Sequence, residues 1–175
     1  GIGGTAYTRN SLAYNPHVTY EPWYNSDGTK MLPADPTKAS DDADRITNST
    51  TNLTSGAKCF HVPRNPVTGD TGANSSLYRW RFNSGGSTAS RCDASSTCTN
   101  TTGCVAFSEF NWTDAKGDTI TRSIAEEWQN YANWYQYYRT RMKMAKASVT
   151  RAFANLDDGY RVGYTSIWDR DLLEI

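Results

Sequence analysis

The most constraining feature of the sequence is a run of apolar and aromatic residues spaced as on one face of a helix. These residues recur in alternating steps of four and three: Ile124, Trp128, Tyr131, Tyr135, Tyr138, Met142, Ala145, Val149, Ala152 and Leu156. The spacing predicts one long amphipathic helix over about 123–156, which would span roughly 48 Å. A stripe of that length must be buried against a large surface, so the rest of the fold has to be built around it.

Signals at both ends of the run support this helix. Ser123 and Glu126 have the spacing of a capping box at the start of the helix. The glycine of Asp157-Asp158-Gly159 can adopt the left-handed conformation that ends a helix. The next residues, 160–167, have the composition of a β-strand. A helix that enters a strand through a short turn normally packs on the sheet of that strand. The alternative is a coiled-coil seam, which Tyr and Trp side chains fit poorly.

Prolines and aromatic residues determine the character of the first 36 residues. Prolines at positions 16, 22, 33 and 36 exclude a long helix there. We therefore expect residues 1–36 to form an extended segment that lies over a larger surface. Its anchors would be the rings of Tyr14, Tyr20, Trp23 and Tyr24.

Residues 37–117 form a loop-rich insertion in this prediction. Short strands are expected at 76–82, where side chains alternate with period two, and at 105–110. Between them, residues 83–104 contain fifteen Ser, Thr, Asn or Gly among twenty-two positions, so burial of apolar side chains cannot order the loop. Residues 118–175 supply the helix and the following strand, and the predicted fold class is α+β.

Four cysteines could order this loop in place of apolar burial: Cys59, Cys92, Cys98 and Cys104. An even number of cysteines in polar surroundings favours disulfides, which form in oxidising compartments, and the sequence leaves all three pairings open. The alternative is a metal site with His61 as the fourth ligand. Five-residue gaps between the last three cysteines disagree with the short ligand spacing of structural zinc sites, so we favour disulfides.

Charge and hydropathy disfavour several functional classes. Eighteen basic residues balance eighteen acidic ones, so no overall positive field attracts nucleic acid. No window approaches the roughly 20 consecutive apolar residues that a bilayer crossing needs, so we expect no membrane insertion. The only histidines, His17 and His61, lie in proline-flanked stretches that predict loops. Without a base beside a nucleophile, we expect no enzymatic activity.

The remaining charge clusters have structural explanations. The acidic pairs at 41–42, 126–127 and 157–158 are interpreted as a solvated loop, a helix start and a turn. The second half of the predicted helix is basic, through Arg139, Arg141, Lys143, Lys146 and Arg151. We interpret these side chains as a solvated face, with a docking surface for an acidic partner as the alternative.

Two segments far apart in the chain have an unusual composition. One is Leu12-Ala13-Tyr14-Asn15-Pro16, continuing to Tyr20-Glu21-Pro22-Trp23; the other is Asn133-Trp134-Tyr135-Gln136-Tyr137-Tyr138-Arg139-Thr140-Arg141-Met142, continuing to Arg151-Ala152-Phe153 and Tyr160-Arg161-Val162-Gly163-Tyr164. Together they resemble the type IV pilus tip adhesin and assembly proteins, the PilY/PilC family. Tyr131 departs from the family pattern, which usually has Phe there, and the cysteine-rich middle resembles no family.

The resemblance implies a component of the bacterial cell surface at the pilus tip, acting in surface attachment, pilus biogenesis and twitching motility. Its expected partners are the remainder of the parent protein, pilin or minor pilin subunits, and a surface or host receptor. The cysteine-bearing insertion is best placed to contact a target. The motif residues are expected to be structural: Tyr14, Pro22, Trp23, Trp134, Tyr138, Arg139, Val162 and Tyr164.

The helix and strand also resemble the first helix and second strand of a von Willebrand factor A domain, which family members carry. In that fold an Asp-x-Ser-x-Ser motif before the helix holds a divalent cation, and no such motif occurs here. The resemblance thus implies an incomplete von Willebrand A-like domain with no cofactor in this segment; any divalent cation would bind elsewhere in a longer parent chain. We also expect the segment to need its parent chain to fold.

Two other functional classes stay open. A secreted carbohydrate-binding module would use exposed Trp and Tyr rings and would bind saccharides as an isolated segment. A structural filament subunit would place the long helix at a subunit interface and would assemble into fibres.

Overall fold

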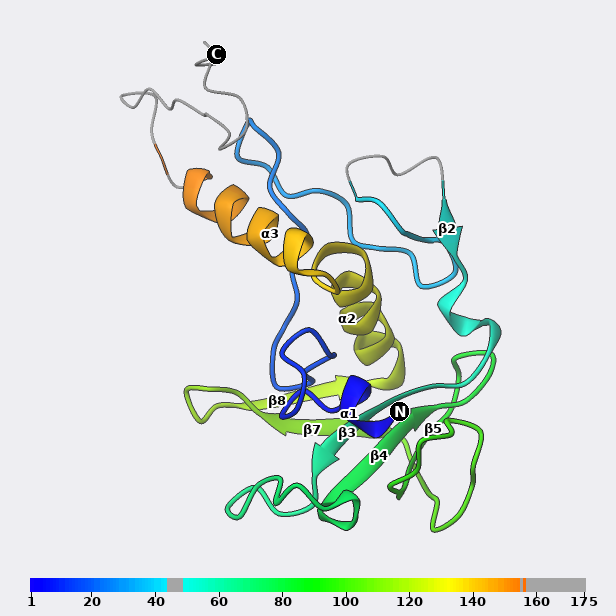
Figure 1. The fold of residues 1–175 in the computed structure, drawn as a ribbon. Helices are drawn as coiled ribbons and strands as arrows, with labels where there is room; N and C mark the ends of the chain where they lie inside the picture. Colours follow the sequence, from blue (N-terminus) through cyan, green and yellow to red (C-terminus); the bar gives the residue numbers. More distant parts are fainter. Residues whose placement is uncertain (44–48, 155, 157–175) are drawn as a thin grey trace.

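The computed structural model describes residues 1–43, 49–154 and 156, and it has the predicted α+β character (Figure 1). The helices in this part of the chain are α1 (Ile2–Thr5), α2 (Ile124–Tyr137) and α3 (Arg141–Phe153). The strands are β1 (Ala39–Ser40), β2 (Thr50–Thr51), β3 (Lys58–Pro63), β4 (Leu77–Phe82), β5 (Ala89–Asp93), β6 (Val105–Phe107), β7 (Glu109–Thr113) and β8 (Thr119–Ser123). Short 3-10 turns lie at η1 (Leu53–Ser55) and η2 (Asn74–Ser76).

The largest sheet has the order β3-β4-β5-β6, and every neighbouring pair is antiparallel. β4 confirms the strand predicted at 76–82. Because side chains alternate along a strand, Trp80 pairs with Phe60 on one face, whereas Arg79 pairs with His61 on the other. β3 and β5 were not predicted, and β5 is composed largely of residue types that are equally common in loops.

The strand predicted at 105–110 is wrong as a single element. The chain breaks at Ser108 into β6, at the end of the large sheet, and β7, which forms a hairpin with β8. The break is stabilised by burial of rings from both pieces. Phe107 contacts Trp80 with ring centroids 5.0 Å apart, and Phe110 contacts Phe82 at 5.6 Å.

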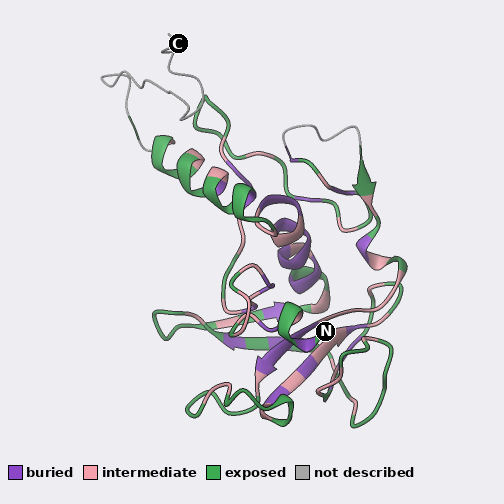
Figure 2. Ribbon diagram, in the orientation of Figure 1, coloured by how far each residue is buried: buried purple, intermediate pink, exposed green. Residues whose placement is uncertain are grey.

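An aromatic core joins the sheet, the β7–β8 hairpin and α2. Phe82 of β4 stacks on Trp128 of α2 with ring centroids 4.1 Å apart, and Trp80 meets Trp112 of β7 at 4.7 Å. Figure 2 shows the buried residues concentrated on α2 and the strands beside it. Each such ring pair contributes about 0.5–1.5 kcal/mol beyond the area it buries. The core is therefore built mainly from rings, as the scarcity of aliphatic residues requires.

The N-terminal segment lies over a larger surface, as predicted, and α2 supplies much of that surface. The expectation that the whole segment is extended is wrong at its start, where Ile2–Thr5 form α1. Tyr14 and Trp23 are only 2% and 3% exposed, and Tyr20 packs against the same core. Tyr24 does not serve as an anchor of this kind, because it lies at the start of a turn and forms an isolated β-bridge with Lys30. Three of the four predicted anchors therefore contact the larger surface.

The capping box predicted at the start of the long helix is confirmed. Ser123 Oγ accepts a hydrogen bond from the Glu126 amide, and the Glu126 carboxylate accepts one from the Ser123 amide at 2.7 Å. The box satisfies amide groups that have no partner within the first turn of α2. The pair therefore fixes where α2 begins.

The single helix predicted over about 123–156 is wrong, because residues 138–140 separate α2 from α3. Thr140 Oγ1 accepts from the Lys143 amide at 3.2 Å, so a second N-cap starts α3. The Tyr137 carbonyl, which a continuous helix would bond internally, instead accepts from the Trp23 indole at 2.9 Å. A tertiary contact and a capping residue thus interrupt a pattern that is continuous in the sequence.

Only the first half of the predicted apolar stripe faces the core. Trp128 and Tyr131 of α2 are buried, whereas Met142 and Val149 of α3 are 68% and 50% exposed. The three residues between the helices change the direction and phase of the second helix. α3 consequently buries Lys143 and Ala147, and much of its surface is exposed in Figure 2.

Several predictions about the C-terminal end lie outside the described residues. They concern the turn at 157–159 and the strand at 160–167, including Val162 and Tyr164. All strand pairs in the described part of the chain are antiparallel, and the von Willebrand A-like assignment stays a prediction. The proposed division at 36 and 117 also stays a prediction, although side chains from all three parts share one core.

Candidate functional site

The two family-like segments contact each other directly, although they are more than 110 residues apart in the chain. Trp134 Nε1 donates to the Leu12 carbonyl at 3.1 Å, and the Tyr138 hydroxyl donates to the Glu21 carbonyl at 2.8 Å. The Trp23 indole donates to the end of α2 as described above. We call this contact between residues 12–23 and 134–139 the motif interface.

The motif interface brings together most of the residues that the sequence singled out. Tyr14, Pro22 and Trp23 are buried in it. Trp134, Tyr138 and Arg139 are half-buried at its edge. Val162 and Tyr164 lie outside the described residues. The ring cluster on α2 is therefore engaged within the protein.

Amide side chains of α2 provide the hydrogen bonds that the extended N-terminal segment lacks. Asn130 Oδ1 accepts from the Tyr20 amide at 2.7 Å, and Asn133 Nδ2 donates to the Tyr20 carbonyl at 2.9 Å. One turn further on, Gln136 Oε1 accepts from the Ser40 amide at 2.8 Å. Buried peptide groups need such partners, and here a helix supplies them in place of a neighbouring strand. The signal that sequence analysis missed is the recurrence of Asn and Gln within an aromatic helix.

A buried ionic network lies beneath the motif interface. The Glu127 carboxylate is fully buried and accepts from the Tyr14 hydroxyl at 2.6 Å, Arg122 Nη1 at 2.9 Å and Trp112 Nε1 at 3.2 Å. Burial raises the pKa of Glu127, while the hydrogen bond from Tyr14 and the charge of Arg122 act in the opposite direction. The interpretation of Glu127 as part of a simple helix start was incomplete, because its neighbour Glu126 does the capping.

A second ion pair ties the motif interface to residues further along the chain. Arg139 Nη2 donates to Asp41 Oδ1 at 2.7 Å, and its guanidinium lies 3.7 Å from the ring centroid of Tyr135. Hydrogen bonds from Ser49 and Tyr135, together with Arg139, lower the pKa of Asp41 to about 2. Asp41 therefore has specific partners, which the sequence interpretation of a solvated acidic pair did not foresee.

On the opposite side of the large sheet, disulfides hold residues 94–104 in place; we call these residues the disulfide loop. All four cysteines are paired, Cys59 with Cys98 and Cys92 with Cys104, which confirms the predicted disulfides and supplies the pairing. Two disulfides are typical of secreted or extracellular proteins.

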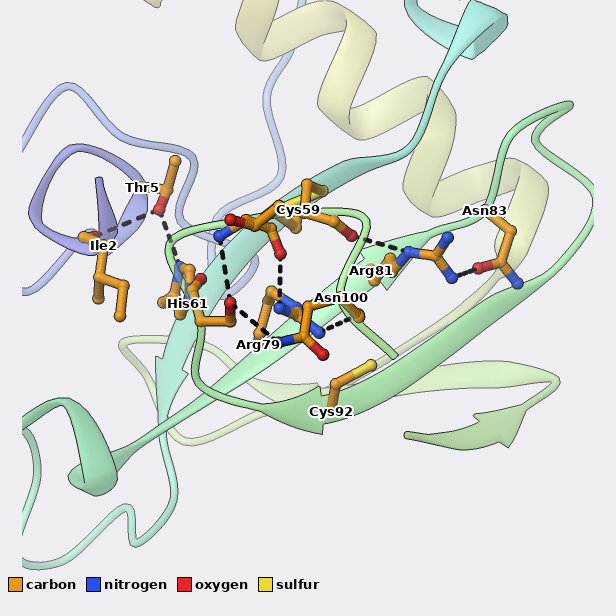
Figure 3. The surroundings of a disulfide bond; sticks show 12 residues. Ile2, Thr5, Cys59, His61, Arg79, Arg81, Asn83, Cys92 and Asn100 are labelled. Atoms are coloured by element: carbon orange, nitrogen blue, oxygen red, sulfur yellow. Dashed lines mark hydrogen bonds between the residues drawn. A yellow bond between two sulfur atoms is a disulfide. The ribbon is translucent and has the colours of Figure 1, made fainter. Parts of the chain in front are cut away.

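Three side chains of the sheet bond the backbone of the disulfide loop (Figure 3). Arg79 Nη1 donates to the Thr97 carbonyl at 2.7 Å and Nη2 donates to the Asn100 carbonyl. Arg81 Nε donates to the Cys98 carbonyl at 2.9 Å. His61 Nε2 bonds the Ser95 carbonyl at 3.1 Å. These contacts orient the loop carbonyls inward, so the loop has a fixed backbone beneath an exposed polar surface.

Arg79 is unusual among the side chains that bond the disulfide loop, because it is fully buried. Desolvation lowers its pKa, and the nearby charge of Arg81 acts in the same direction. Loop carbonyls, which carry partial negative charge, take the place of a carboxylate partner for its two terminal nitrogens. The alternation of residues along β4 predicted a strand but not the burial of Arg79, which the disulfide loop covering this face explains.

His61 departs from its predicted place in a loop. It lies in β3, is 1% exposed, and its Nδ1 lies 2.8 Å from Thr5 Oγ1. His17 does lie in a turn, where Nδ1 donates to the Thr113 carbonyl at 2.7 Å. Both imidazoles thus have structural hydrogen bonds.

No group of three or more His, Cys, Asp or Glu side chains in the described part of the chain is arranged to hold a metal ion. Among the described residues, no helix has the length and apolar character of a membrane span. The disulfide loop presents mainly hydroxyl and amide groups, among them Ser96, Thr99 and Thr101, all of which are exposed. Such a surface can form many hydrogen bonds with a partner.

The chain matches no protein-family model, and no curated protein or solved structure shows significant similarity to it. Functional inference therefore rests on the residues and their arrangement.

Proposed function

We propose that this chain is part of a type IV pilus tip adhesin and that it presents the disulfide loop to a surface or host receptor. The observation that carries the proposal is the motif interface. Two segments that resemble the same family, at opposite ends of the described chain, form one interlocked unit. Residues between them, which resemble no family, supply a rigid loop on the other side of the sheet.

This arrangement separates two roles. The motif interface is largely buried and is joined by hydrogen bonds between the two segments, so it suits a scaffold that joins the remainder of the parent protein and, through it, pilin or minor pilin subunits. The disulfide loop has a fixed backbone and exposed polar side chains, so it suits contact with a target. In this proposal the family function in pilus biogenesis and twitching motility depends on the scaffold, whereas attachment depends on the loop.

The carbohydrate-binding alternative receives less support from the same contacts. Trp134 and Tyr138, which would stack on a sugar, bond the N-terminal segment instead. Tyr78, a further half-buried ring, has the guanidinium groups of Arg64 and Arg91 at 4.2 and 4.4 Å from its centroid. These rings are therefore already in contact with other side chains.

A separation-of-function experiment in the native bacterium tests the proposal. Thr99→Arg with Thr101→Arg changes the exposed loop surface, and Ala115→Arg makes the same kind of change at the exposed tip of the β7–β8 hairpin. We expect the loop variant to lose surface attachment while pilus number and twitching remain at wild-type levels. Ala115→Arg should retain all three activities.

The scaffold is tested in the same strains. Trp134→Ala removes a ring and an indole donor from the motif interface, and we expect it to reduce protein level, pilus number and twitching together. Immunogold labelling should place the wild-type protein at pilus ends. Labelling elsewhere on the cell, or attachment unaffected by the loop variant, would contradict the proposal.

A further inference from the structure

Arg91 of β5 is a half-buried arginine whose guanidinium has no oxygen acceptor in the described part of the chain. Its contacts are with rings: the guanidinium carbon lies 4.4 Å from the ring centroid of Tyr78 and 5.9 Å from that of Trp80. A guanidinium has N–H donors and no acceptor, so these donors are left for solvent or a ligand. The other buried or half-buried arginines that the structure describes all donate to a carboxylate or carbonyl oxygen: Arg9, Arg79, Arg81, Arg122 and Arg139.

Tyr78 holds the guanidinium of Arg91 in place. The guanidinium of Arg64 lies over the same ring, 4.2 Å from its centroid. Stacking engages the flat face of a guanidinium and leaves the N–H groups at its edge free to donate. A side chain that is already ordered loses little conformational entropy when it binds a ligand. Arg91 is therefore a preorganised donor.

Charge indicates what these donors fit. Arg64 is neutralised, since its Nη2 donates to Asp93 Oδ1 at 2.7 Å. No carboxylate among the described residues forms an ion pair with Arg91, so the cluster of these three side chains keeps a net positive charge. A guanidinium pairs with a carboxylate through two parallel hydrogen bonds, which are about twice as strong as neutral ones. A carboxylate is thus the group that completes the cluster.

An apolar side chain lies beside the unpaired guanidinium. Val105 of β6 is the cross-strand partner of Arg91 and is 60% exposed. Cross-strand partners have side chains on the same face of a sheet, with Cβ atoms about 4.5–5.5 Å apart. A peptide carries carboxylate and aliphatic side chains close together, as this pair requires. A saccharide would instead stack on an open ring face, and two guanidinium groups already lie over Tyr78.

We propose that this surface, which we call the Arg91 site, binds an acidic peptide segment. A glutamate or aspartate carboxylate of the peptide pairs with the guanidinium of Arg91, and a neighbouring apolar side chain packs on Val105. Because Arg91 pairs with Trp80 and not with Arg79, the Arg91 site lies on the sheet face opposite to the one that the disulfide loop covers. The proposal does not depend on the pilus function, and it can fail or succeed independently of it.

Fluorescence anisotropy of a labelled peptide, with the full chain as the binding partner, tests the proposal. The probe is a synthetic peptide of three glutamates followed by three valines, with both ends blocked so that they carry no charge. Its control peptide has glutamine in place of each glutamate. We expect the glutamate peptide to bind the wild-type chain about tenfold or more tightly than the glutamine peptide, because only a carboxylate forms the charged pair. Equal binding of the two peptides, or no binding of either, would overturn the proposal.

Variants of the chain locate the site. Arg91→Gln should weaken binding of the glutamate peptide by about tenfold or more, to the level of the glutamine peptide. Arg91→Lys keeps a charge beside the rings, yet it should weaken binding by about threefold or more, because an ammonium lacks the paired donors. Arg141→Gln, which alters an exposed arginine of α3, should retain wild-type affinity.

Two results with these reagents would contradict the assignment. Equal losses in Arg91→Gln and Arg141→Gln would mean that the peptide responds to overall charge and not to the Arg91 site. Displacement of the labelled peptide by a hyaluronan hexasaccharide as readily as by unlabelled peptide would show that any carboxylate suffices, and a peptide would no longer be the ligand that the site selects.

Discussion

The residue with the largest predicted effect on stability is Glu127. Its carboxylate neutralises Arg122, which is buried and also bonds the Pro16 carbonyl at 2.9 Å. Glu127→Gln would leave that guanidinium without its counter-charge and set an amide against it. We expect a loss of about 3–5 kcal/mol in the free energy of unfolding, measured by urea denaturation at pH 7.

The neighbouring carboxylate is a matched control for this change. Glu126→Gln alters an exposed capping residue and should cost about 1 kcal/mol or less. Equal losses for the two variants would mean that the buried network contributes no more than an ordinary helix cap.

The burial of His61 predicts how the free energy of unfolding depends on pH. Burial lowers the pKa of His61 to about 4, below its ordinary value of 6.5, because the charged imidazolium loses its hydration. The unfolded chain therefore binds the proton more tightly. Stability from the neutral imidazole is fully present above pH 6.5 and is lost as the pH falls towards 4, by at most about 3 kcal/mol.

Urea midpoints at pH 7.5 and pH 4.5 measure this loss. His61→Gln removes the titrating group, so its midpoint should change less between the two pH values than that of the wild-type protein. If His61→Gln and the wild-type protein showed the same pH dependence, the loss of stability at low pH would have to come from other titrating groups.

At the scale of single elements, the N-cap of α3 offers the clearest test. Thr140→Ala removes the hydroxyl that bonds the Lys143 amide, and we expect a loss of about 1 kcal/mol in the free energy of unfolding. Ser148→Ala is the control, since Ser148 is exposed within α3 and its hydroxyl donates to the Met144 carbonyl one turn back. That variant should be neutral or slightly stabilising. A larger loss for Ser148→Ala would contradict the cap.

Local signals made some elements predictable, and tertiary contacts decided the others. Ser123 and Glu126 specify the start of α2 because both partners of the capping box lie within one turn. The break before Thr140 depends on Trp23, which is more than a hundred residues away and leaves no trace in the helical period. The burial of Arg79 likewise depends on a loop whose position is fixed by disulfides. Sequence analysis therefore identified the cysteines and the motif residues but not the side chains that connect them.

At the scale of the whole molecule, the two disulfides are expected to stabilise the folded chain by different amounts. Cys59 and Cys98 are 39 residues apart, and Cys92 and Cys104 are 12 apart. Loop-closure entropy gives about 4 kcal/mol for the longer link and about 3 kcal/mol for the shorter one. We expect Cys59→Ser with Cys98→Ser to destabilise the chain more than Cys92→Ser with Cys104→Ser, as measured by urea denaturation under oxidising conditions. The reverse order would show that contacts of the folded loop outweigh chain entropy.

The motif interface also determines when the chain can fold. The hydrogen bonds that join Leu12 and Trp23 to α2 have to wait for more than a hundred later residues to be made. At synthesis rates of 5–20 residues per second, that delay is roughly 5–25 s. During this time Trp23 lacks the carbonyl at the end of α2 that accepts its indole hydrogen bond, and Tyr14 lacks the rings of Tyr131 and Trp134 that pack on it. The order of synthesis thus keeps the N-terminal segment unfolded until the helix that binds it has emerged.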